Sequence, residues 1–382
     1  MRLAVIRQRY TPFGGAERFL ESALSSLIAR DIAVTLYTRE WNAPSPNGIE
    51  PRIVDPFHIG GLWRDWSFAR AVCKALAHDG AALVQSHERL SCCDLFRAGD
   101  GVHAAWLDER IRHLSPLRGF GIRINPHHRY RLAAERRMYA SARLRAVICN
   151  SQMVKNDIRT RFDVPDERLH VIYNAVDTDT FTPSLRAHRE RIRARHRIPV
   201  RAMVYLQVGS GFERKGVAAS IDALAELPPP AHLIVVGKDK HLARYAARAR
   251  RLGLSGRVTL AGPQPDPRPY YGAADAFVLP TLYDPCPNAA LEAMACALPI
   301  VTSTRSGAAE LALAHDAGLV CAPGDVGQLA SHMHALQQPA TRERMGANAR
   351  NAMLPLTSAA MTSRLLALYS DLLADRRHGA DP

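Results

Sequence analysis

The sequence lacks the cysteine patterns that bind zinc. Its seven cysteines include no C-x-x-C pair and no spacing of cysteine and histidine typical of zinc ligands. We therefore expect most of them to be buried, reduced thiols. No apolar run approaches the roughly 18 residues of a membrane span, and the start of the chain is too short and too charged for the apolar core of a signal peptide. These absences predict a protein that stays in the cytoplasm.

Lysine is scarce, since only five of the 50 basic residues are lysines, although the net charge is +14. Residues 110–145 hold ten arginines and one acid, Glu135, and residues 186–201 hold seven arginines and one acid, Glu190. Such stretches indicate an anionic partner, either a phosphorylated substrate, an anionic membrane surface or nucleic acid. Solvated helix faces account for part of the excess. Because the first stretch has few aromatic residues and no nucleic-acid motif is present, we predict no nucleic-acid binding.

The chain of 382 residues, 47% of them hydrophobic, is long enough for two domains with full cores. Short apolar runs typical of buried strands lie at residues 3–6, 33–37, 82–85 and 146–149, and again at 203–208, 233–236, 258–260, 276–279 and 300–302. Helix-length or turn-rich stretches separate most of them, which predicts parallel sheets. The expected fold class is α/β, with two doubly wound, Rossmann-like domains facing a cleft. We place them at residues 1–178 and 179–357, with a turn-rich hinge at 174–183 and a last helix, about 358–382, packing back on the first domain.

Two glycine-containing turns follow predicted strands. Gly14 and Gly15 do not form the G-x-G-x-x-G fingerprint, so they either approach an anionic or hydroxylated ligand or make a plain tight turn. The stretch from Gly209 to Gly216 follows a strand and carries Arg214 and Lys215, two adjacent cations that suit a pyrophosphate. Cations at a helix start would oppose the helix dipole, which favours a functional reason for them. A P-loop is disfavoured, because valine follows Gly216 where lysine is required.

A proline opens the helix predicted after the strand at 276–279. Pro287 in that position leaves the amides of Asn288, Ala289 and Ala290 to face a ligand. We expect Glu292 in the first turn, where it can accept hydrogen bonds from a ribose diol, and Asp284 beside a sugar ring. Alternatively, both acids only cap the helix.

Three polar residues of the first half follow predicted strands and are candidates to face the cleft: His87, Asp100 and His103. Either histidine could instead be structural. A D-x-D sequence, Asp177 and Asp179, lies in the hinge and not at the end of a strand, so we assign it to a turn and predict no metal.

These motifs together resemble the family 4 retaining glycosyltransferases of the GT-B type, specifically the lipopolysaccharide core glucosyltransferases. The resemblance lies in Phe13-Gly14-Gly15, Val147-Ile148-Cys149-Asn150-Ser151, the hinge from Asn174 to Phe181, the stretch from Gly209 to Gly216 and the acidic helix motif. In that family the acidic motif has two glutamates separated by seven residues. Here the first position is Asp284 and the second is Glu292. Because the first carboxylate is shorter than in the family, the sequence defines the donor sugar less well than it defines the family.

The resemblance implies roles for the candidates. Arg214 and Lys215 would hold the pyrophosphate of a nucleotide-sugar, Glu292 the ribose, and Asp284 the sugar hydroxyls. The expected donor-binding residues are Gly14, Gly15, Gly209, Arg214, Lys215, Asp284, Asn288, Ala289, Ala290 and Glu292. The expected catalytic residues are Asp100, His103, Arg214, Lys215 and Asp284, and those on the acceptor side are His87, Asp100 and His103.

The resemblance also implies an activity: transfer of a hexose, foremost glucose from UDP-glucose, onto a heptose of the lipopolysaccharide inner core, with retention and without a metal or other cofactor. Residues 110–145 would hold the enzyme on the anionic inner membrane. The alternatives are a UDP-GlcNAc, UDP-galactose or GDP-mannose donor in cell-surface polysaccharide synthesis, a UDP-GlcNAc epimerase, and a non-catalytic protein that binds anionic glycans.

Overall fold

The computed structural model describes residues 2–10, 32–41 and 49–378. The chain divides into two compact units. Unit 1 comprises Met1–Ala175 and Ser358–Pro382, and unit 2 comprises Val176–Thr357. The division falls inside the turn-rich stretch that we predicted as a hinge.

Unit 1 is built on a seven-stranded sheet in the order β5-β3-β1-β6-β7-β8-β9, and its strand pairs are parallel. The strands are β1 (Arg2–Ile6), β3 (Ala33–Thr38), β5 (Ile49–Ile53), β6 (Leu83–Ser86), β7 (Leu95–Arg97), β8 (Ala146–Cys149) and β9 (Leu169–Val171). A separate pair is formed by β2 (Arg9–Tyr10) and β4 (Glu40–Trp41). The four strands predicted here are confirmed. The sequence missed β5, which contains Pro51 and charged residues, and β7 and β9, which have only three residues each.

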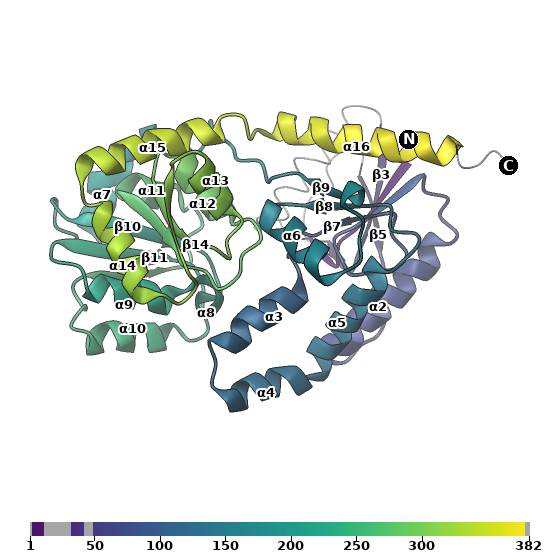
Figure 1. The fold of residues 1–382 in the computed structure, drawn as a ribbon, viewed down its shortest axis with the longest axis horizontal. Helices are drawn as coiled ribbons and strands as arrows, with labels where there is room; N and C mark the ends of the chain where they lie inside the picture. The colour runs from purple at the N-terminus through teal and green to yellow at the C-terminus, as the bar shows by residue number, and fades with distance from the viewer. Residues whose placement is uncertain (1, 11–31, 42–48, 379–382) are drawn as a thin grey trace. The chain divides into compact units, whose positions relative to one another are not determined.

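The helices of unit 1 include α2 (Gly60–Leu76), α3 (His103–Arg112), α4 (Pro116–Ile124), α5 (Pro126–Tyr139), α6 (Gln152–Arg161) and α16 (Ser358–His378). Helix α16 comes from the far end of the chain and packs on the sheet of unit 1 (Figure 1). Its apolar residues Met361, Leu365 and Leu368 recur at helical spacing and share a core cluster with Leu3 and Val5 of β1. This burial explains why the last helix belongs to unit 1, although unit 2 separates it in sequence from the rest of unit 1.

Unit 2 is built on a six-stranded parallel sheet in the order β12-β11-β10-β13-β14-β15. The strands are β10 (Met203–Val208), β11 (Ala231–Val236), β12 (Val258–Gly262), β13 (Ala276–Leu279), β14 (Ile300–Ser303) and β15 (Gly318–Cys321). Five of these were predicted, and β15 was not. The chain runs outward from β10 through β12 and then returns to pair β13 with β10. Such a reversal marks the ligand-binding edge of an open α/β sheet.

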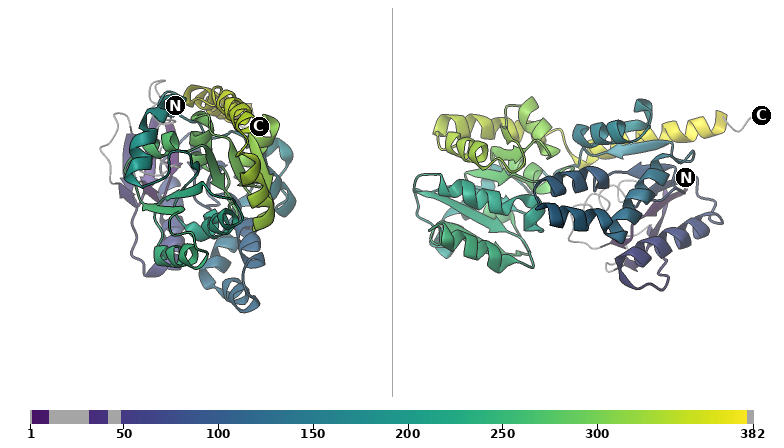
Figure 2. Two further views of the ribbon diagram at one scale, coloured as in Figure 1. Left: turned by 90° about the vertical axis from the view of Figure 1, so that its left-hand side faces the viewer. Right: turned by 60° about the horizontal axis from the view of Figure 1, so that its bottom comes forward.

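Helices cover both faces of this sheet, as Figure 1 and the views of Figure 2 show. They are α7 (Arg189–Arg195), α8 (Phe212–Lys215), α9 (Val217–Ala225), α10 (Leu242–Arg251), α11 (Arg268–Ala273), α12 (Asn288–Ala295), α13 (Ala308–Ala314), α14 (Val326–Ala335) and α15 (Pro339–Met353). Residues of α9, α10 and α14 share one core cluster with β10, β11 and β13. Two parallel α/β units were predicted, and this fold class is confirmed.

Part of the second arginine-rich stretch has a structural role. Arg193 of α7 is only 4% exposed, and its guanidinium lies 2.8 Å from a carboxylate oxygen of Asp275. Arg189 pairs with the other oxygen of Asp275 at 2.6 Å. These cations are neutralised inside unit 2, so the excess charge of residues 186–201 indicates an external anion less strongly than the sequence suggested.

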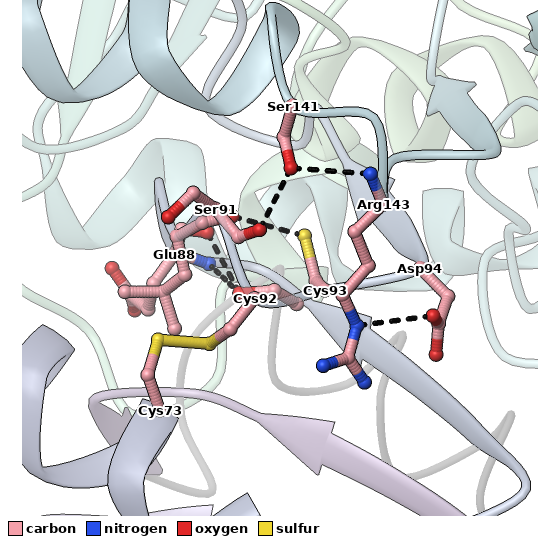
Figure 3. Close-up of a disulfide and its surroundings, with 10 residues drawn as sticks. Cys73, Glu88, Ser91, Cys92, Cys93, Asp94, Ser141 and Arg143 are labelled. Atoms are coloured by element: carbon pink, nitrogen blue, oxygen red, sulfur yellow. Dashed lines mark hydrogen bonds and ion pairs between the residues drawn. A yellow bond between two sulfur atoms is a disulfide. The ribbon is translucent and has the colours of Figure 1, made fainter. Parts of the chain in front are cut away.

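Cys73 and Cys92 form a disulfide that joins α2 to the loop between β6 and β7 (Figure 3). The five other cysteines are buried and form no disulfide, which agrees with the expectation for most of them. No sequence motif indicated the bond, because the two cysteines stand 19 residues apart and outside any recognisable pattern. The described helices include none that is long and apolar enough to cross a membrane.

Candidate active site

Two loops of unit 2 meet where β10 and β13 end. One loop follows β10 and includes Gly209 and α8, and the other connects β13 to α12. Because β10 and β13 are neighbours in a parallel sheet, both loops leave the same edge. The backbone N–H of Leu282 and the hydroxyl of Thr281 each donate a hydrogen bond of 2.8 Å to the carbonyl oxygen of Arg214. These bonds fix the two loops to one another.

Glycine permits the close approach of these loops at two positions. Gly216 has a φ of +73°, and a Cβ on it would lie 2.1 Å from the carbonyl oxygen of Pro280. Gly209 has a φ of +147°, and a Cβ there would lie 2.9 Å from Cε of Lys215. The side chain of Lys215 therefore passes directly over the backbone of Gly209.

Arg214, Lys215 and Asp284 form one cluster. The ammonium of Lys215 lies 2.5 Å from Oδ2 of Asp284, and Nη1 of Arg214 lies 3.1 Å from the same oxygen. Arg214 also donates to the carbonyl oxygen of Tyr283 at 3.1 Å. Two cations from one motif and an acid from another thus come together, although we expected them to contact different parts of the donor.

Burial and charge set the ionisation of this cluster. Lys215 is 8% exposed and Asp284 is 6% exposed. Burial opposes ionisation of Asp284, but Lys215 and Arg214 outweigh it and hold the pKa of the carboxyl below its ordinary value. Burial lowers the pKa of Lys215, and Asp284 limits this fall. The carboxyl of Asp284 is therefore ionised at neutral pH.

The position of the cations corrects one sequence inference. We expected Arg214 and Lys215 at a helix start, where their charge opposes the dipole. In the structure they are the last two residues of α8, which ends at Lys215, and carbonyl groups at a helix end favour positive charge. The helix dipole therefore gives no reason to assign these two cations a function.

Helix α12 corrects two further predictions. The amide of Ala290 is not available to a ligand, because it donates to the carbonyl oxygen of Pro287 at 2.9 Å. Glu292 is not in the first turn, since α12 begins at Asn288 and Glu292 is its fifth residue. The alternative that both acids cap α12 is also wrong. The capping position is Pro287, which has no side-chain cap, and Asp284 pairs with the cations instead.

Tyr271 of α11 holds Glu292. Its hydroxyl donates a 2.7 Å hydrogen bond to Oε2 of Glu292, and both residues are buried. The hydroxyl also lies 3.3 Å from the carbonyl oxygen of Ala289. Sequence reasoning missed Tyr271, because a tyrosine in a short helix before a strand is most simply a core residue. The bond orients the carboxylate that we assigned to a ribose.

The candidates of unit 1 lie after β6 and β7. His103 is the first residue of α3 and is 5% exposed, and its Nε2 lies 3.2 Å from Nδ1 of His128. Burial, together with Arg131 and Arg89, lowers the pKa of His103 to about 2. The ring is therefore neutral at neutral pH. Asp100 is exposed in the turn that precedes α3.

His87 is buried at the end of β6. One ring nitrogen lies 3.1 Å from Nε2 of Gln85, whose Oε1 accepts a 2.6 Å hydrogen bond from the hydroxyl of Tyr369. Burial, followed by Arg97 and Arg7, places the pKa of His87 well below its ordinary value. These contacts belong to the packing of α16 on the sheet, so they favour the structural interpretation of His87.

Two residues that the sequence analysis did not select support the turn at Asp100. Nε of Arg89 lies 3.0 Å from Oε1 of Glu135, and Arg89 also donates to the carbonyl oxygen of Gly101 at 3.2 Å. Glu135 accepts hydrogen bonds from the backbone N–H groups of His103 and Ala104 at 2.8 and 3.2 Å. The single acid of the first arginine-rich stretch thus caps α3.

Gly14 and Gly15 lie outside the described residues. In the parts of the chain that the structure describes, no group of three or more histidine, cysteine or acidic residues is arranged to hold a metal ion. Asp177 accepts hydrogen bonds from the backbone N–H groups of Asp179 and Thr180 at 3.1 and 2.9 Å, so it does form a turn.

Two family models match the chain in succession. The Glycosyltransferase Family 4 model matches residues 13–180, and the model of Glycosyl transferases group 1 matches residues 188–352. The second match contains the whole cluster of Arg214, Lys215 and Asp284 together with Glu292. The chain therefore belongs to the glycosyltransferases, with a Family 4 domain followed by a group 1 domain.

The chain is similar to lipopolysaccharide enzymes. It is 27% identical to the lipopolysaccharide glucosyltransferase WaaG of Escherichia coli (strain K12) over 92% of this chain and 94% of that protein. It is 33% identical to the lipopolysaccharide core biosynthesis glycosyltransferase LpsE of Rhizobium meliloti, over 38% of this chain and 42% of that protein. A crystal structure of WaaG matches with a TM-score of 0.80 at 26% identity, covering 94% of this chain and 98% of its own. The fold is thus the GT-B fold of WaaG.

Proposed function

We propose that this glycosyltransferase transfers glucose from UDP-glucose to a heptose of the lipopolysaccharide inner core, with retention at the anomeric carbon and without a metal ion. The likeness to WaaG supports the donor and the acceptor class. The observation that carries the proposal is the cluster in unit 2, where Arg214 and Lys215 share the carboxylate of Asp284. Two fixed cations next to an exchangeable anion suit a ligand that brings a diphosphate.

In this proposal the diphosphate replaces Asp284 as the partner of the two cations. The carboxylate of Asp284 then accepts hydrogen bonds from hydroxyl groups of the donor sugar. Glu292, held by Tyr271 at 2.7 Å, accepts hydrogen bonds from the ribose diol. The backbone at Asn288 and Ala289 lies at the start of α12 and donates to the remaining oxygens.

The transfer step breaks the bond between the anomeric carbon and the β-phosphate oxygen and forms a bond from that carbon to the acceptor oxygen on the same face. The departing β-phosphate takes the proton of the acceptor hydroxyl, so UDP leaves with it. Negative charge grows on the leaving phosphate, and Arg214 and Lys215 stabilise it. In unit 1, Asp100 or the neutral ring of His103 orients the acceptor hydroxyl.

Replacing Lys215 tests this role. Lys215→Ala should lower kcat for transfer by roughly 10²–10³, because one preorganised contact to the developing charge is lost. The control is Lys240→Ala, which removes an exposed lysine of the same unit. Near-normal turnover by Lys215→Ala would show that the cluster does not stabilise the leaving group.

The alternatives predict different results. Thermal shifts with UDP-glucose, UDP-GlcNAc, UDP-galactose and GDP-mannose identify the donor, and the absence of any shift would favour a non-catalytic binding protein. An epimerase would convert UDP-GlcNAc without an acceptor, whereas a transferase requires one for net transfer. Product analysis with and without acceptor separates these two activities.

We propose in addition that α4 and its neighbours bind the anionic surface of the inner membrane. The apolar side chains of Leu117, Phe120 and Ile124 on α4 are 87%, 62% and 54% exposed. Exposed arginines accompany them at positions Arg112, Arg118, Arg123, Arg129, Arg136, Arg137 and Arg143. Each well-placed cation contributes about 1 kcal/mol at an anionic lipid surface, and apolar residues add to this.

Vesicle co-sedimentation tests the membrane proposal. Binding should rise with the phosphatidylglycerol content, fall with salt, and weaken in the double variant Arg118→Gln and Arg123→Gln. The control removes the same charge from unit 2, with Arg195→Gln and Arg201→Gln at exposed positions. Binding that ignores lipid charge, or that falls equally in both variants, contradicts the proposal.

A further inference from the structure

One face of α5 contacts the start of α3. His128, Arg131 and Glu135 are spaced by three and four residues, so they lie on the same side of α5. His128 contacts the ring of His103 at 3.2 Å, and Glu135 accepts the backbone N–H of His103 at 2.8 Å. Arg131 lies on the same face of α5, about one turn from each of these two residues, and its charge acts on the ring of His103.

The guanidinium of Arg131 is half-buried, and among the described residues it has no hydrogen bond or ion pair. Its neighbour Arg89 differs, because it is bonded to Glu135 and to the carbonyl oxygen of Gly101. Burial lowers the pKa of Arg131, and the charge of Arg89 lowers it further. A desolvated guanidinium beside a second one costs stability unless an anion compensates it.

The acids near Arg131 are engaged elsewhere or exposed to water. The acids that act on its charge are Asp65, Asp100 and Glu88. Asp65 is bonded to His127 at 2.9 Å, Glu88 accepts the backbone N–H of Gln8 at 3.0 Å, and Asp100 is exposed. None of the three makes an ion pair with Arg131.

The two histidine rings beside Arg131 experience positive charge. After burial, the groups that lower the pKa of His103 are Arg131, Arg89, His128 and His127. Burial, Arg110, His127 and Arg131 lower the pKa of His128. Neutral imidazoles can donate an N–H to an anion without adding a charge that must be compensated.

We propose that Arg131, with His128 and Arg89 beside it, forms a site in unit 1 for a phosphate monoester. The guanidinium fork matches two phosphate oxygens, and a dianion would compensate the charge that Arg131 now leaves unbalanced. The phosphate is carried either by a sugar or by a lipid headgroup. The identification of this sugar as the acceptor rests on the proposed function. Phosphate binding at this site does not depend on the proposed function.

Direct binding tests the site without any transfer reaction. Calorimetric titrations of the full chain use inorganic phosphate, glucose 6-phosphate and glucose, at constant ionic strength in chloride. Arg131→Gln is compared with Arg129→Gln, which removes the same charge from an exposed position on the same helix. We expect glucose 6-phosphate to bind at least tenfold more weakly to Arg131→Gln, with Arg129→Gln within twofold of the wild type and glucose not binding.

A folding control accompanies the titrations. Because Arg131 has no hydrogen bond or ion pair within the described part of the chain, Arg131→Gln should melt no lower than the wild type in phosphate-free buffer. Arg131→Lys keeps the charge without the fork and should lose part of the affinity. The site is overturned if Arg131→Gln binds glucose 6-phosphate like the wild type, or if both arginine variants weaken it equally, which would indicate an adventitious ion only.

Two more measurements separate the sources of the phosphate. If a sugar carries it, Arg131→Gln should bind vesicles containing phosphatidic acid as the wild type does, and should raise the KM for a phosphorylated acceptor with kcat within twofold. If a lipid carries it, Arg131→Gln should lose the preference for phosphatidic acid over phosphatidylglycerol. Should transfer fail with every acceptor, the proposed function falls while the calorimetric result still decides the site.

Discussion

The ammonium of Lys215 lies 2.5 Å from a carboxylate oxygen of Asp284, although 69 residues separate them in sequence. The neighbouring strands β10 and β13 bring their loops to one edge of the sheet, and the pair is buried there. The carboxylate of Asp284 therefore pairs with the two cations that we propose to bind the diphosphate. A diphosphate that binds to these two cations must displace the carboxylate of Asp284 from them.

This exchange predicts opposite effects on binding and on transfer. Asp284→Asn removes the competing anion, so UDP should bind up to about tenfold more tightly, equal to about 1.4 kcal/mol. Transfer should slow by roughly 10²-fold, because the sugar hydroxyls lose a charged acceptor. Calorimetry with UDP and steady-state kinetics measure the two effects. Asp266→Asn, at an exposed position of the same unit, should change neither. Unchanged or weaker UDP binding would contradict the exchange.

Glu135 is predicted to maintain the turn that presents Asp100 and His103. Glu135→Ala leaves the buried guanidinium of Arg89 and two backbone N–H groups without their partner, so it should lower the free energy of unfolding by about 4 kcal/mol. Glu135→Gln keeps one acceptor oxygen and should lose about 2 kcal/mol. Urea unfolding measures both. Glu167→Ala, an exposed control in unit 1, should stay within about 0.5 kcal/mol of the wild type. Equal losses in the two Glu135 variants would disprove the cap.

The sequence predicted the sheets and the donor-side cluster far better than the contacts within unit 1. Alternating apolar runs identify strands such as β10 and β13, and loops after parallel strands necessarily share an edge, so Lys215 and Asp284 could be predicted to lie near one another. Nothing local indicates that Tyr271 orients Glu292 or that Glu135 caps α3, because these contacts arise only from packing. The proline signal placed the start of α12 correctly to within one residue, but Glu292 is the fifth residue of the helix, so assigning it to the first turn was an error of counting and not of the helix start.

The disulfide between Cys73 and Cys92 gives a chemical prediction. A thiol count in denaturant without reductant should find five thiols, and prior reduction should raise it to seven. The double variant Cys73→Ser and Cys92→Ser should lose about 3 kcal/mol of stability, since a bond across 19 residues restricts the unfolded chain. Dithiothreitol should destabilise the wild type by a similar amount and leave the double variant unaffected. Seven thiols in the protein before reduction would show that the bond is absent.

The neutral state of His103 predicts how stability depends on pH. Its pKa in the folded chain is about 2, well below the ordinary value of a histidine, so between these values only the unfolded chain binds the proton. The free energy of unfolding should therefore fall as the pH drops below about 6.5, by about 2 kcal/mol at pH 5 from this residue alone. His103→Gln removes that contribution, so its loss between pH 7.5 and pH 5 should be smaller by about this amount in urea unfolding. His113→Gln, at the exposed position that directly follows α3, should lose as much as the wild type. Contributions from the other buried histidines, such as His87, cancel in the comparison. Identical losses of stability in all three proteins would mean that His103 can be protonated in the folded chain.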